Sequence, residues 1–492
     1  MRHVLAIDCG TTGITALVID EHASVVARGY REFLQHFPRP GWVEHDPGEI
    51  WDATVGAIGH ALVTAGIEVR DLHAIGITNQ RETTVLWDRE TLEPVHNALV
   101  WQDRRTARRC DEVRAHEDMI RAKTGLVVDA YFSATKLEWI LANVEGGREA
   151  AEAGRLAFGT IDTWVIAKLT GGASHVTDHS NASRTLLYDI YRRQWDDDLL
   201  ALFGVPPSVL PEVRPSSGSF GTAELYGARI PISGVAGDQQ AALFGQACFE
   251  PGMTKNTYGT GSFVLMNTGD KAPAPPAGLL VTLACGHDGA VAYALEGSIF
   301  VTGAAIQWLR DGLGIIGSAA EAGPLAATVP DNGGVYFVPA LTGLGSPYWD
   351  QYARGTIVGI TRGTTRAHLA RAAVEAMAYQ TRDIVEAMQR EAGVSLTELR
   401  VDGGASVMDL LCRLQADQLG VTVRRPAVQE TTALGAAFLA GLAEGVWSST
   451  DELAKTWRLD EEFEPELDRT HADALYAGWQ RAVERARDWA RD

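Results

Sequence analysis

The stretch VLAIDCGTTG, residues 4–13, places an acid and a turn of small residues directly after an apolar strand. Glycine allows backbone N–H groups to turn inward around an anion, and threonine hydroxyls add donors. A carboxylate at a strand end, here Asp8, can hold Mg²⁺ through water. A second apolar strand follows at residues 16–19. The stretch therefore predicts a phosphate-binding hairpin, unlike the strand-to-helix glycine loops of Rossmann and Walker proteins, although ordinary hairpins share the pattern.

The chain has 492 residues, too many for one compact core, and we expect two large lobes. Apolar strand-like segments alternate with helical ones in both halves, which is typical of an α/β fold. A lobe boundary near Gly245 divides the chain into residues 1–245 and 246–492. The expected strands are residues 3–8, 16–20, 74–79, 97–101, 333–340, 355–360 and 398–404, the expected helices 47–66 and 368–393, and the expected loops 206–221 and 271–278.

Composition narrows the classes of partner. A net charge of −20 disfavours nucleic acid and anionic membranes. The apolar run before Asp8 is too short for a signal peptide, and no segment reaches the ~18 apolar residues of a membrane span, so we expect a cytoplasmic protein without membrane insertion. The five cysteines are scattered without a CxxC pair, which argues against disulfides and zinc and predicts reduced, buried thiols.

Acidic glycine turns follow apolar strands three times, at residues 7–13, 233–240 and 400–406. Three such turns could surround one nucleotide. The middle turn carries Asp238 where a strand meets a helix. This acid could cap the helix, deprotonate a substrate hydroxyl, or do both.

Arg81 and Glu82 directly follow another expected strand. An arginine fork beside a carboxylate suits a polyol, because each hydroxyl both donates and accepts a hydrogen bond. The alternative is a surface ion pair. Trp101, Tyr131 and Phe263 lie in turn-rich segments where a carbon skeleton could pack against aromatic rings, although each could also belong to the core.

Together these segments resemble the FGGY carbohydrate kinases across nearly the whole chain. The matching stretches are residues 40–51, 76–84, 124–136, 158–164, 176–185, 232–246, 255–263 and 338–350, with the family signatures around Lys136 and Trp139 and at 355–375. The resemblance implies two actin-like, ribonuclease H-type lobes, with the active site in the cleft between them. It also implies a homo-oligomer, either dimer or tetramer.

The activity implied is ATP-dependent phosphorylation of glycerol to sn-glycerol 3-phosphate in glycerol catabolism. Asp238 would be the general base, and Asp8 would anchor Mg²⁺. Glycerol would contact Arg81, Glu82, Trp101, Tyr131, Asp238, Gln239 and Phe263. ATP would contact Thr11, Thr12, Gly13, Thr260, Gly303, Gln307, Gly404 and Met408.

Three departures from the family pattern bear on the nucleotide. Cys9 stands where a glutamine is common, Thr15 where many relatives have arginine, and Met408 near the position of an asparagine beside adenine. Losing one charge-assisted contact costs roughly 1.5–3 kcal/mol unless another donor substitutes. Two alternatives therefore accompany the main hypothesis: a kinase for another small polyol or ketose, and a binding or sensor paralogue impaired in phosphoryl transfer.

Overall fold

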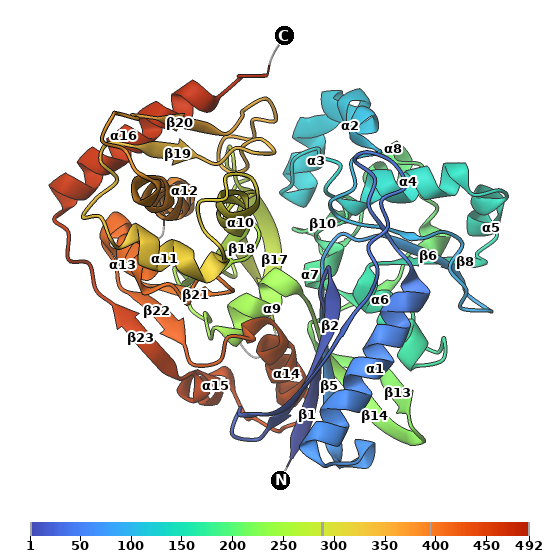
Figure 1. Ribbon diagram of the computed structural model, residues 1–492. Coiled ribbons are helices and arrows are strands. Elements are labelled where there is room, and N and C mark those ends of the chain that lie inside the picture. The colour runs from blue at the N-terminus through green and yellow to red at the C-terminus, as the bar shows by residue number, and fades with distance from the viewer. Residues whose placement is uncertain (1, 287–289, 394, 491–492) are drawn as a thin grey trace.

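The computed structural model describes residues 2–286, 290–393 and 395–490, which form two lobes, each built on a mixed β-sheet (Figure 1). The N-terminal sheet has the order β13-β14-β5-β1-β2-β3, and the C-terminal sheet the order β17-β18-β16-β15-β21-β22-β23. The N-terminal strands are β1 (His3–Cys9), β2 (Gly13–Asp20), β3 (Val25–Glu32), β5 (Leu72–Asn79), β13 (Ser217–Leu225) and β14 (Ala228–Gly237). The C-terminal strands are β15 (Thr254–Tyr258), β16 (Ser262–Gly269), β17 (Leu280–Cys285), β18 (Val291–Ile299), β21 (Leu399–Asp402), β22 (Val423–Pro426) and β23 (Leu459–Phe463).

The same strand arrangement occurs at the centre of both sheets. In one, β1 pairs antiparallel with β2 and parallel with β5. In the other, β15 pairs antiparallel with β16 and parallel with β21. Each sheet therefore carries a hairpin turn, at residues 10–12 and 259–261, beside the end of a parallel strand. The turn at residues 10–12 belongs to the predicted phosphate-binding hairpin, and the turn at 259–261 contains Thr260, a predicted ATP contact.

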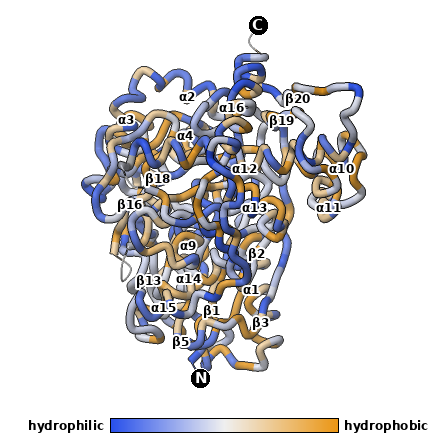
Figure 2. Tube along the Cα trace, turned by 90° about the vertical axis from the view of Figure 1, so that its left-hand side faces the viewer, coloured by the Kyte–Doolittle hydropathy of each residue, from blue (hydrophilic) through white to orange (hydrophobic). Residues whose placement is uncertain are grey.

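The principal helices are α1 (Pro47–Ala65), α9 (Asp238–Gly245), α10 (Gly303–Asp311), α12 (Arg366–Ala392), α13 (Asp409–Leu419), α14 (Thr431–Ala443) and α16 (Arg469–Ala486). Local sequence sets their ends. Asp46 caps α1 by accepting a hydrogen bond from the Gly48 N–H, Pro47 takes the first helical position, and left-handed Gly66 ends the helix. In the side view of Figure 2, α10 and α11 (Ala322–Ala326) lie at one edge, and the two chain ends lie at opposite poles.

The other elements are short. The helices are α2 (Ala107–Val113), α3 (Glu117–Thr124), α4 (Ser133–Asn143), α5 (Gly147–Glu152), α6 (Ile161–Leu169), α7 (His179–Ala182), α8 (Asp197–Leu202) and α15 (Thr450–Thr456). The strands are β4 (Glu44–His45), β6 (Val85–Asp88), β7 (Ala98–Leu99), β8 (Leu156–Gly159), β9 (Val176–Asp178), β10 (Tyr188–Asp189), β11 (Gln194–Trp195), β12 (Glu212–Arg214), β19 (Tyr336–Val338) and β20 (Thr356–Val358).

The two faces of the N-terminal sheet bury different cores. On β1, Leu5 and Ile7 belong to the core that also includes residues of α1, whereas Val4 and Ala6 belong to the core that includes residues of α14. Successive side chains of a strand point to opposite faces. Asp8 therefore projects from the α14 face, and so does Thr15, its cross-strand partner on β2.

Helix α14 lies between β22 and β23 of the C-terminal sheet in sequence but packs against the N-terminal sheet. Glycines allow this close approach. A Cβ on Gly76 of β5 would lie 2.1 Å from the Ala436 carbonyl oxygen, and a Cβ on Gly435 would lie 1.9 Å from the Ala241 carbonyl oxygen of α9. Helices α9 and α14 are thus in backbone contact where the two lobes join.

Most predicted elements are confirmed. The first hairpin is β1 and β2, the long helices are α1 and α12, and residues 271–278 contain neither helix nor strand. The prediction of a loop at 206–221 is wrong, because it includes β12 and the start of β13. Its glycines and serines belong to an edge strand with a register shift between Ser217 and Gly221, which composition alone does not distinguish from a loop.

The cysteines and the apolarity of the helices can also be compared with the sequence-based predictions. All five cysteines are buried and unpaired, as expected. Within the described ranges, no helix is both long enough and apolar enough to cross a bilayer.

Candidate active site

Arg81 is the centre of the candidate substrate site. It follows β5 and is almost fully buried. Its Nη1 and Nη2 donate to the two carboxylate oxygens of Glu296, at 2.6 and 3.0 Å. Its Nε lies 3.2 Å from Oδ1 of Asp238, and Nη2 also donates to the Tyr131 hydroxyl at 3.4 Å. Glu296 lies on β18, so this one guanidinium joins residues of both sheets.

Glu82 is buried beside Arg81, which excludes the surface ion pair considered above. It accepts a hydrogen bond from Arg184 Nε at 2.7 Å, and Arg184 Nη2 donates to Glu296 at 3.0 Å. Burial by itself raises the pKa of Glu296, but the charges of Arg184 and Arg81 outweigh it and lower the pKa to about 2. Burial raises the pKa of Glu82, while Arg81 and Arg184 oppose that rise. Two arginines and two carboxylates therefore share one buried network in which Glu296 is ionised, and this network holds Arg81 rigidly.

The three predicted aromatic residues gather on this network. The rings of Trp101 and Tyr131 meet edge to face at 5.7 Å between centroids. The Arg81 guanidinium carbon lies 6.0 Å from the Phe263 ring centroid. Trp101 Nε1 also donates to the Thr11 hydroxyl at 3.0 Å. Trp101 and Phe263 are partly exposed, so apolar ring surface remains open beside the polar groups.

Asp238 is the first residue of α9, and Gly237 is the N-cap, so the acid is not the cap that its position suggested. Its Oδ1 accepts the Gln239 N–H at 2.7 Å. The side chain keeps 31% of its surface exposed, against 1% for Arg81. Among the described residues, no hydrogen bond reaches Oδ2. A partly exposed carboxylate with one oxygen fixed and the other unengaged can accept a proton from a bound hydroxyl.

Gln239 is held from the C-terminal sheet. Lys255 of β15 donates to its side-chain oxygen, to the Thr257 hydroxyl at 2.8 Å and to the Phe263 carbonyl at 3.3 Å. Burial lowers the pKa of Lys255 to about 8. Gln239 is therefore fixed beside the hairpin that carries Phe263.

Asp8 lies close enough to Asp238 for the charge of Asp238 to act on its carboxyl group. Burial, and next the negative charge of Asp238, raise its pKa to about 7, while Arg28 opposes the shift. A bound divalent cation would offset the effect of burial and of the Asp238 charge on Asp8, so the pair fits Mg²⁺. No group of three or more metal-binding side chains occurs in the described part of the chain. Phosphate oxygens and water would have to supply the remaining ligands.

The predicted nucleotide residues of the C-terminal lobe meet around Tyr258. The Gly303 N–H donates to the Gly259 carbonyl at 3.0 Å, and a Cβ on Gly303 would lie 2.6 Å from that oxygen. The turn after β21 packs here too, because a Cβ on Gly403 would lie 2.5 Å from the Tyr258 carbonyl oxygen. A Cβ on Gly404 would meet no atom within 4 Å. These two turns therefore form one backbone surface that is open at Gly404.

The remaining predicted residues border that surface or the first loop. Gln307 is exposed on α10, and Met408 precedes α13. Thr11, Thr12 and Gly13 stay with the N-terminal sheet, where the Gln35 amide donates to the Thr11 carbonyl. In the described residues, no hydrogen bond or ion pair joins residues 10–13 to the turns at 259–261 and 403–406. The structure thus brings the polyol set together and leaves the two phosphate turns on separate lobes.

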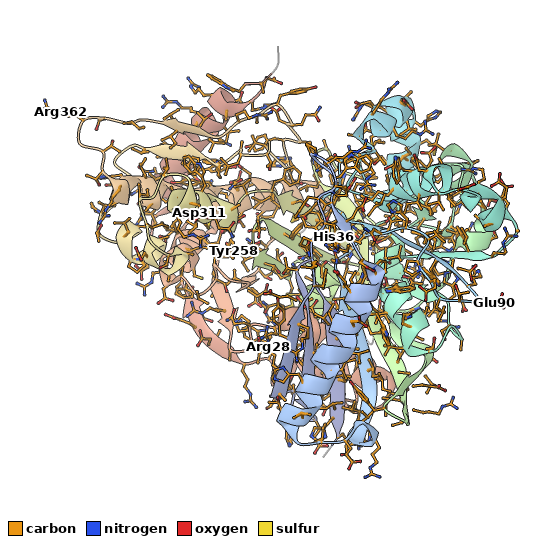
Figure 3. The ribbon with its side chains drawn as sticks, turned by 45° about the vertical axis from the view of Figure 1, so that its right-hand side comes forward. Arg28, His36, Glu90, Tyr258, Asp311 and Arg362 are labelled. Atoms are coloured by element: carbon orange, nitrogen blue, oxygen red, sulfur yellow. The ribbon has the colours of Figure 1, made fainter. Side chains whose placement is uncertain are left out.

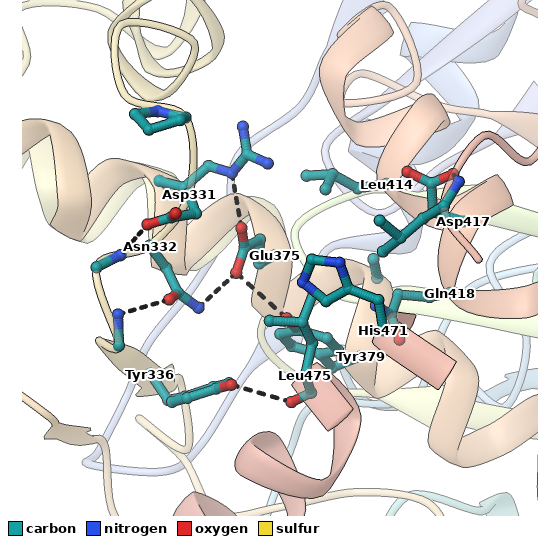
Figure 4. A pocket seen from close by; sticks show the side chains of 16 residues that line it. Asp331, Asn332, Tyr336, Glu375, Tyr379, Leu414, Asp417, Gln418, His471 and Leu475 are labelled. Atoms are coloured by element: carbon teal, nitrogen blue, oxygen red, sulfur yellow. Dashed lines mark hydrogen bonds and ion pairs between the residues drawn. The ribbon is translucent and has the colours of Figure 1, made fainter. Parts of the chain in front are cut away.

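A cavity of about 440 Å³ lies elsewhere, among α12, α13 and α16 (Figure 4). None of the predicted site residues lines it. Its polar groups bond one another: Glu375 accepts hydrogen bonds from Arg371, Asn332 and Tyr379. We therefore place no chemistry in this cavity.

Residues 3–245 match the N-terminal domain of the FGGY family of carbohydrate kinases, and residues 254–444 match the C-terminal domain of that family. The chain belongs to the FGGY carbohydrate kinases. It is 58% identical to a glycerol kinase of Petrotoga mobilis over 492 residues, covering 99% of each chain. A glycerol kinase of Deinococcus radiodurans is 59% identical over 494 residues, covering 100% of this chain and 99% of that one.

Solved structures agree with this assignment. The crystal structure of Plasmodium falciparum glycerol kinase with ADP has a TM-score of 0.92 and 36% identity, covering 99% of this chain and 98% of that one. The two sheets described above are accordingly those of an actin-like, ribonuclease H-type FGGY kinase, as the sequence led us to expect.

Sequence-based prediction did not name three residues that contact the predicted substrate residues of the candidate site: Arg184, Glu296 and Lys255. Glu296 had a usable signal, because it is the only acid in the apolar strand β18. Lys255 and Arg184 lie in stretches that resemble the family, but their local sequence gives no hint that their partners come from distant elements.

Proposed function

We propose that the protein transfers the γ-phosphoryl group of ATP to a terminal hydroxyl of glycerol, producing sn-glycerol 3-phosphate for glycerol catabolism. The observation that carries the proposal is the contact between buried Arg81 and partly exposed Asp238, with the aromatic residues Phe263 and Tyr131 beside Arg81. The glycerol kinases of P. mobilis and D. radiodurans support the same substrate, because they resemble the chain over almost its full length.

Glycerol would bind against Arg81, Glu82 and Tyr131, with its carbons packed on Trp101 and Phe263. A hydroxyl needs both a donor and an acceptor, which an arginine beside carboxylates provides. Because Glu296 fixes the guanidinium, little orientational freedom would be lost when glycerol binds.

In the reaction, Asp238 would accept the proton of the terminal hydroxyl through its free carboxylate oxygen. The hydroxyl oxygen would form a bond to the γ-phosphorus as the bond from that phosphorus to the bridging oxygen breaks, and ADP would leave. Gln239, fixed by Lys255, would lie beside the reacting hydroxyl. Asp8 would hold Mg²⁺ against the phosphates, where the ion supplies charge neutralisation.

ATP would lie between the two backbone turns. Thr11, Thr12 and Gly13 would contact its phosphates from the lobe of residues 1–245. Thr260, Gly303, Gln307, Gly404 and Met408 would contact it from the lobe of residues 246–492, with Met408 near the base. A cytoplasmic location and a homo-oligomeric state complete the proposal.

An ADP-release assay over a panel of substrates tests this function. With ATP and Mg²⁺, we expect glycerol to give the highest kcat/KM, above four- and five-carbon polyols and ketoses. A ketose as the best substrate would establish the alternative kinase. Glycerol binding without ADP release would establish the impaired sensor.

A further inference from the structure

We propose that Arg28, on the third strand of the N-terminal sheet, binds the β- and γ-phosphates of the nucleotide. The inference rests on the proposed function, because it assumes that ATP lies between the two lobes. Nothing in the local sequence of Arg28 suggests a site, since the residue lies within an ordinary polar strand, β3.

Strand register places Arg28 on the same face as the phosphate-binding hairpin. Thr15 is the cross-strand partner of both Asp8 and Tyr30. Arg28 pairs with Leu17, two residues from Thr15, and Leu17 belongs to the core on the α14 face. Residues two apart on a strand share a face, so Arg28 and Thr15 are diagonal neighbours. Arg28 thus projects toward the C-terminal lobe, as Asp8 does.

The side chain of Arg28 leans along this face toward the hairpin. Its guanidinium carbon lies 5.2 Å from the ring centroid of Tyr30. Tyr30 itself extends toward the loop, since a Cβ on Gly13 would lie 2.7 Å from the Tyr30 hydroxyl. Arg28 also opposes the rise in the pKa of Asp8, as expected of a cation acting on that carboxylate.

Residues that hold the turn after β21 of the C-terminal lobe lie on the other side of Arg28. Arg28 Nε lies 3.7 Å from Glu430 Oε1. The neighbours of Glu430 hold the turn after β21: Gln429 accepts a hydrogen bond from Ser406, and Thr431 donates to Asp402 at 2.7 Å. Figure 3 labels Arg28 on the N-terminal sheet, at the side that faces the C-terminal lobe. The guanidinium therefore lies between the first hairpin and the residues that hold the turn after β21.

Arg28 is also available for a ligand. Its side chain is 50% exposed, and its ion pair with Glu430 is too long for a hydrogen bond. Within the described chain, the guanidinium makes no hydrogen bond. The other cations near the site are occupied, because Arg81 binds Glu296 and Lys255 binds Gln239. Arg28 can therefore supply the charge that Thr15 does not.

Isothermal titration calorimetry with ATP, ADP and AMP tests the assignment, with excess Mg²⁺ and without glycerol. In Arg28→Gln we expect Kd to rise about 5- to 20-fold for ATP and ADP, and less than about 2-fold for AMP, because AMP has neither phosphate. Arg28→Lys should lose less affinity for ATP and ADP than Arg28→Gln. Glu430→Gln is the matched control, because it removes the ion pair but keeps the cation, and it should bind ATP at least as tightly as the wild type.

Three results would overturn the assignment: unchanged ATP and ADP affinities in Arg28→Gln, an equal loss for AMP, or the same loss in Glu430→Gln. The last would mean that Arg28 only joins the lobes. Failure of the proposed function is distinguishable, because the ADP-release assay with glycerol measures that function separately, whereas nucleotide binding is measured here without glycerol. The melting temperature of Arg28→Gln should be close to that of the wild type, since the residue is half exposed.

Discussion

At the scale of single residues, the active site depends on charges that the fold places close together. The negative charge of Asp238 acts on Asp8, whereas Arg81 and Glu296 neutralise each other at 2.6 Å. The first pair fits a bound cation, and the second pair is complete. This contrast separates the groups that would meet the phosphates and metal from those that position the polyol site.

The carboxylate of Asp8 should make stability depend on pH. Its pKa is 3.8 when unperturbed, and burial and the charge of Asp238 raise it to about 7. Between those values the unfolded chain releases the proton while the folded protein keeps it, so this group lowers the free energy of unfolding as pH rises. Asp8→Asn lacks this contribution. Urea unfolding at about pH 5 and about pH 8 should therefore show the variant gaining stability relative to the wild type at the higher pH, whereas a pH-independent difference would contradict the assignment.

Thr15 offers a second test of charge at the first loop. If Arg28 already serves the phosphates, Thr15→Arg in the wild type should change the ATP KM less than about 2-fold. The same substitution in Arg28→Gln should restore most of the lost affinity, because residue 15 is a diagonal neighbour on the same face. Steady-state kinetics of the four proteins give the comparison. Equal effects of Thr15→Arg in both backgrounds would show that the two positions act independently.

At the scale of elements, the sequence predicted the first hairpin, α1 and α12 because apolar periodicity and capping residues are local signals. It could not predict that α14 crosses to the N-terminal sheet, since that depends on glycines whose partners are distant in sequence. The predicted polyol residues gather as expected. Glu296 and Lys255 were missed because their partners are also distant in sequence. Both missed residues reach the site from the C-terminal sheet.

The contact between α9 and α14 can be tested with one added methyl group. Gly435→Ala should destabilise the protein by about 1–3 kcal/mol, because its Cβ would lie 1.9 Å from a backbone oxygen. Gly56→Ala in α1 is the matched control, since its Cβ would meet only the flexible Arg31 side chain, at 3.3 Å. Alanine there should be neutral or stabilising, by up to about 1 kcal/mol. Chemical denaturation measures the free energy of unfolding of both variants. Similar changes in Gly435→Ala and Gly56→Ala would show that α14 does not depend on close backbone contact.

At the scale of the whole molecule, the polyol site and the nucleotide turns are built from both lobes. Arg81, which follows β5, is bound by Glu296 of β18, and Gln239 of α9 is bound by Lys255 of β15. These ties place Asp238 beside the hairpin of the C-terminal lobe. In the proposed mechanism, this arrangement would let one carboxylate serve a hydroxyl on one side while phosphates are held on the other.

The direct test of that arrangement is single-turnover phosphoryl transfer to glycerol in Asp238→Asn, with glycerol binding measured separately by calorimetry. The amide keeps the shape of the carboxylate but cannot accept the proton, so we predict a rate about 10²–10⁴ lower than that of the wild type, with glycerol affinity largely retained. Transfer at the wild-type rate in this variant would contradict the role of Asp238 as the base and, with it, the proposed mechanism.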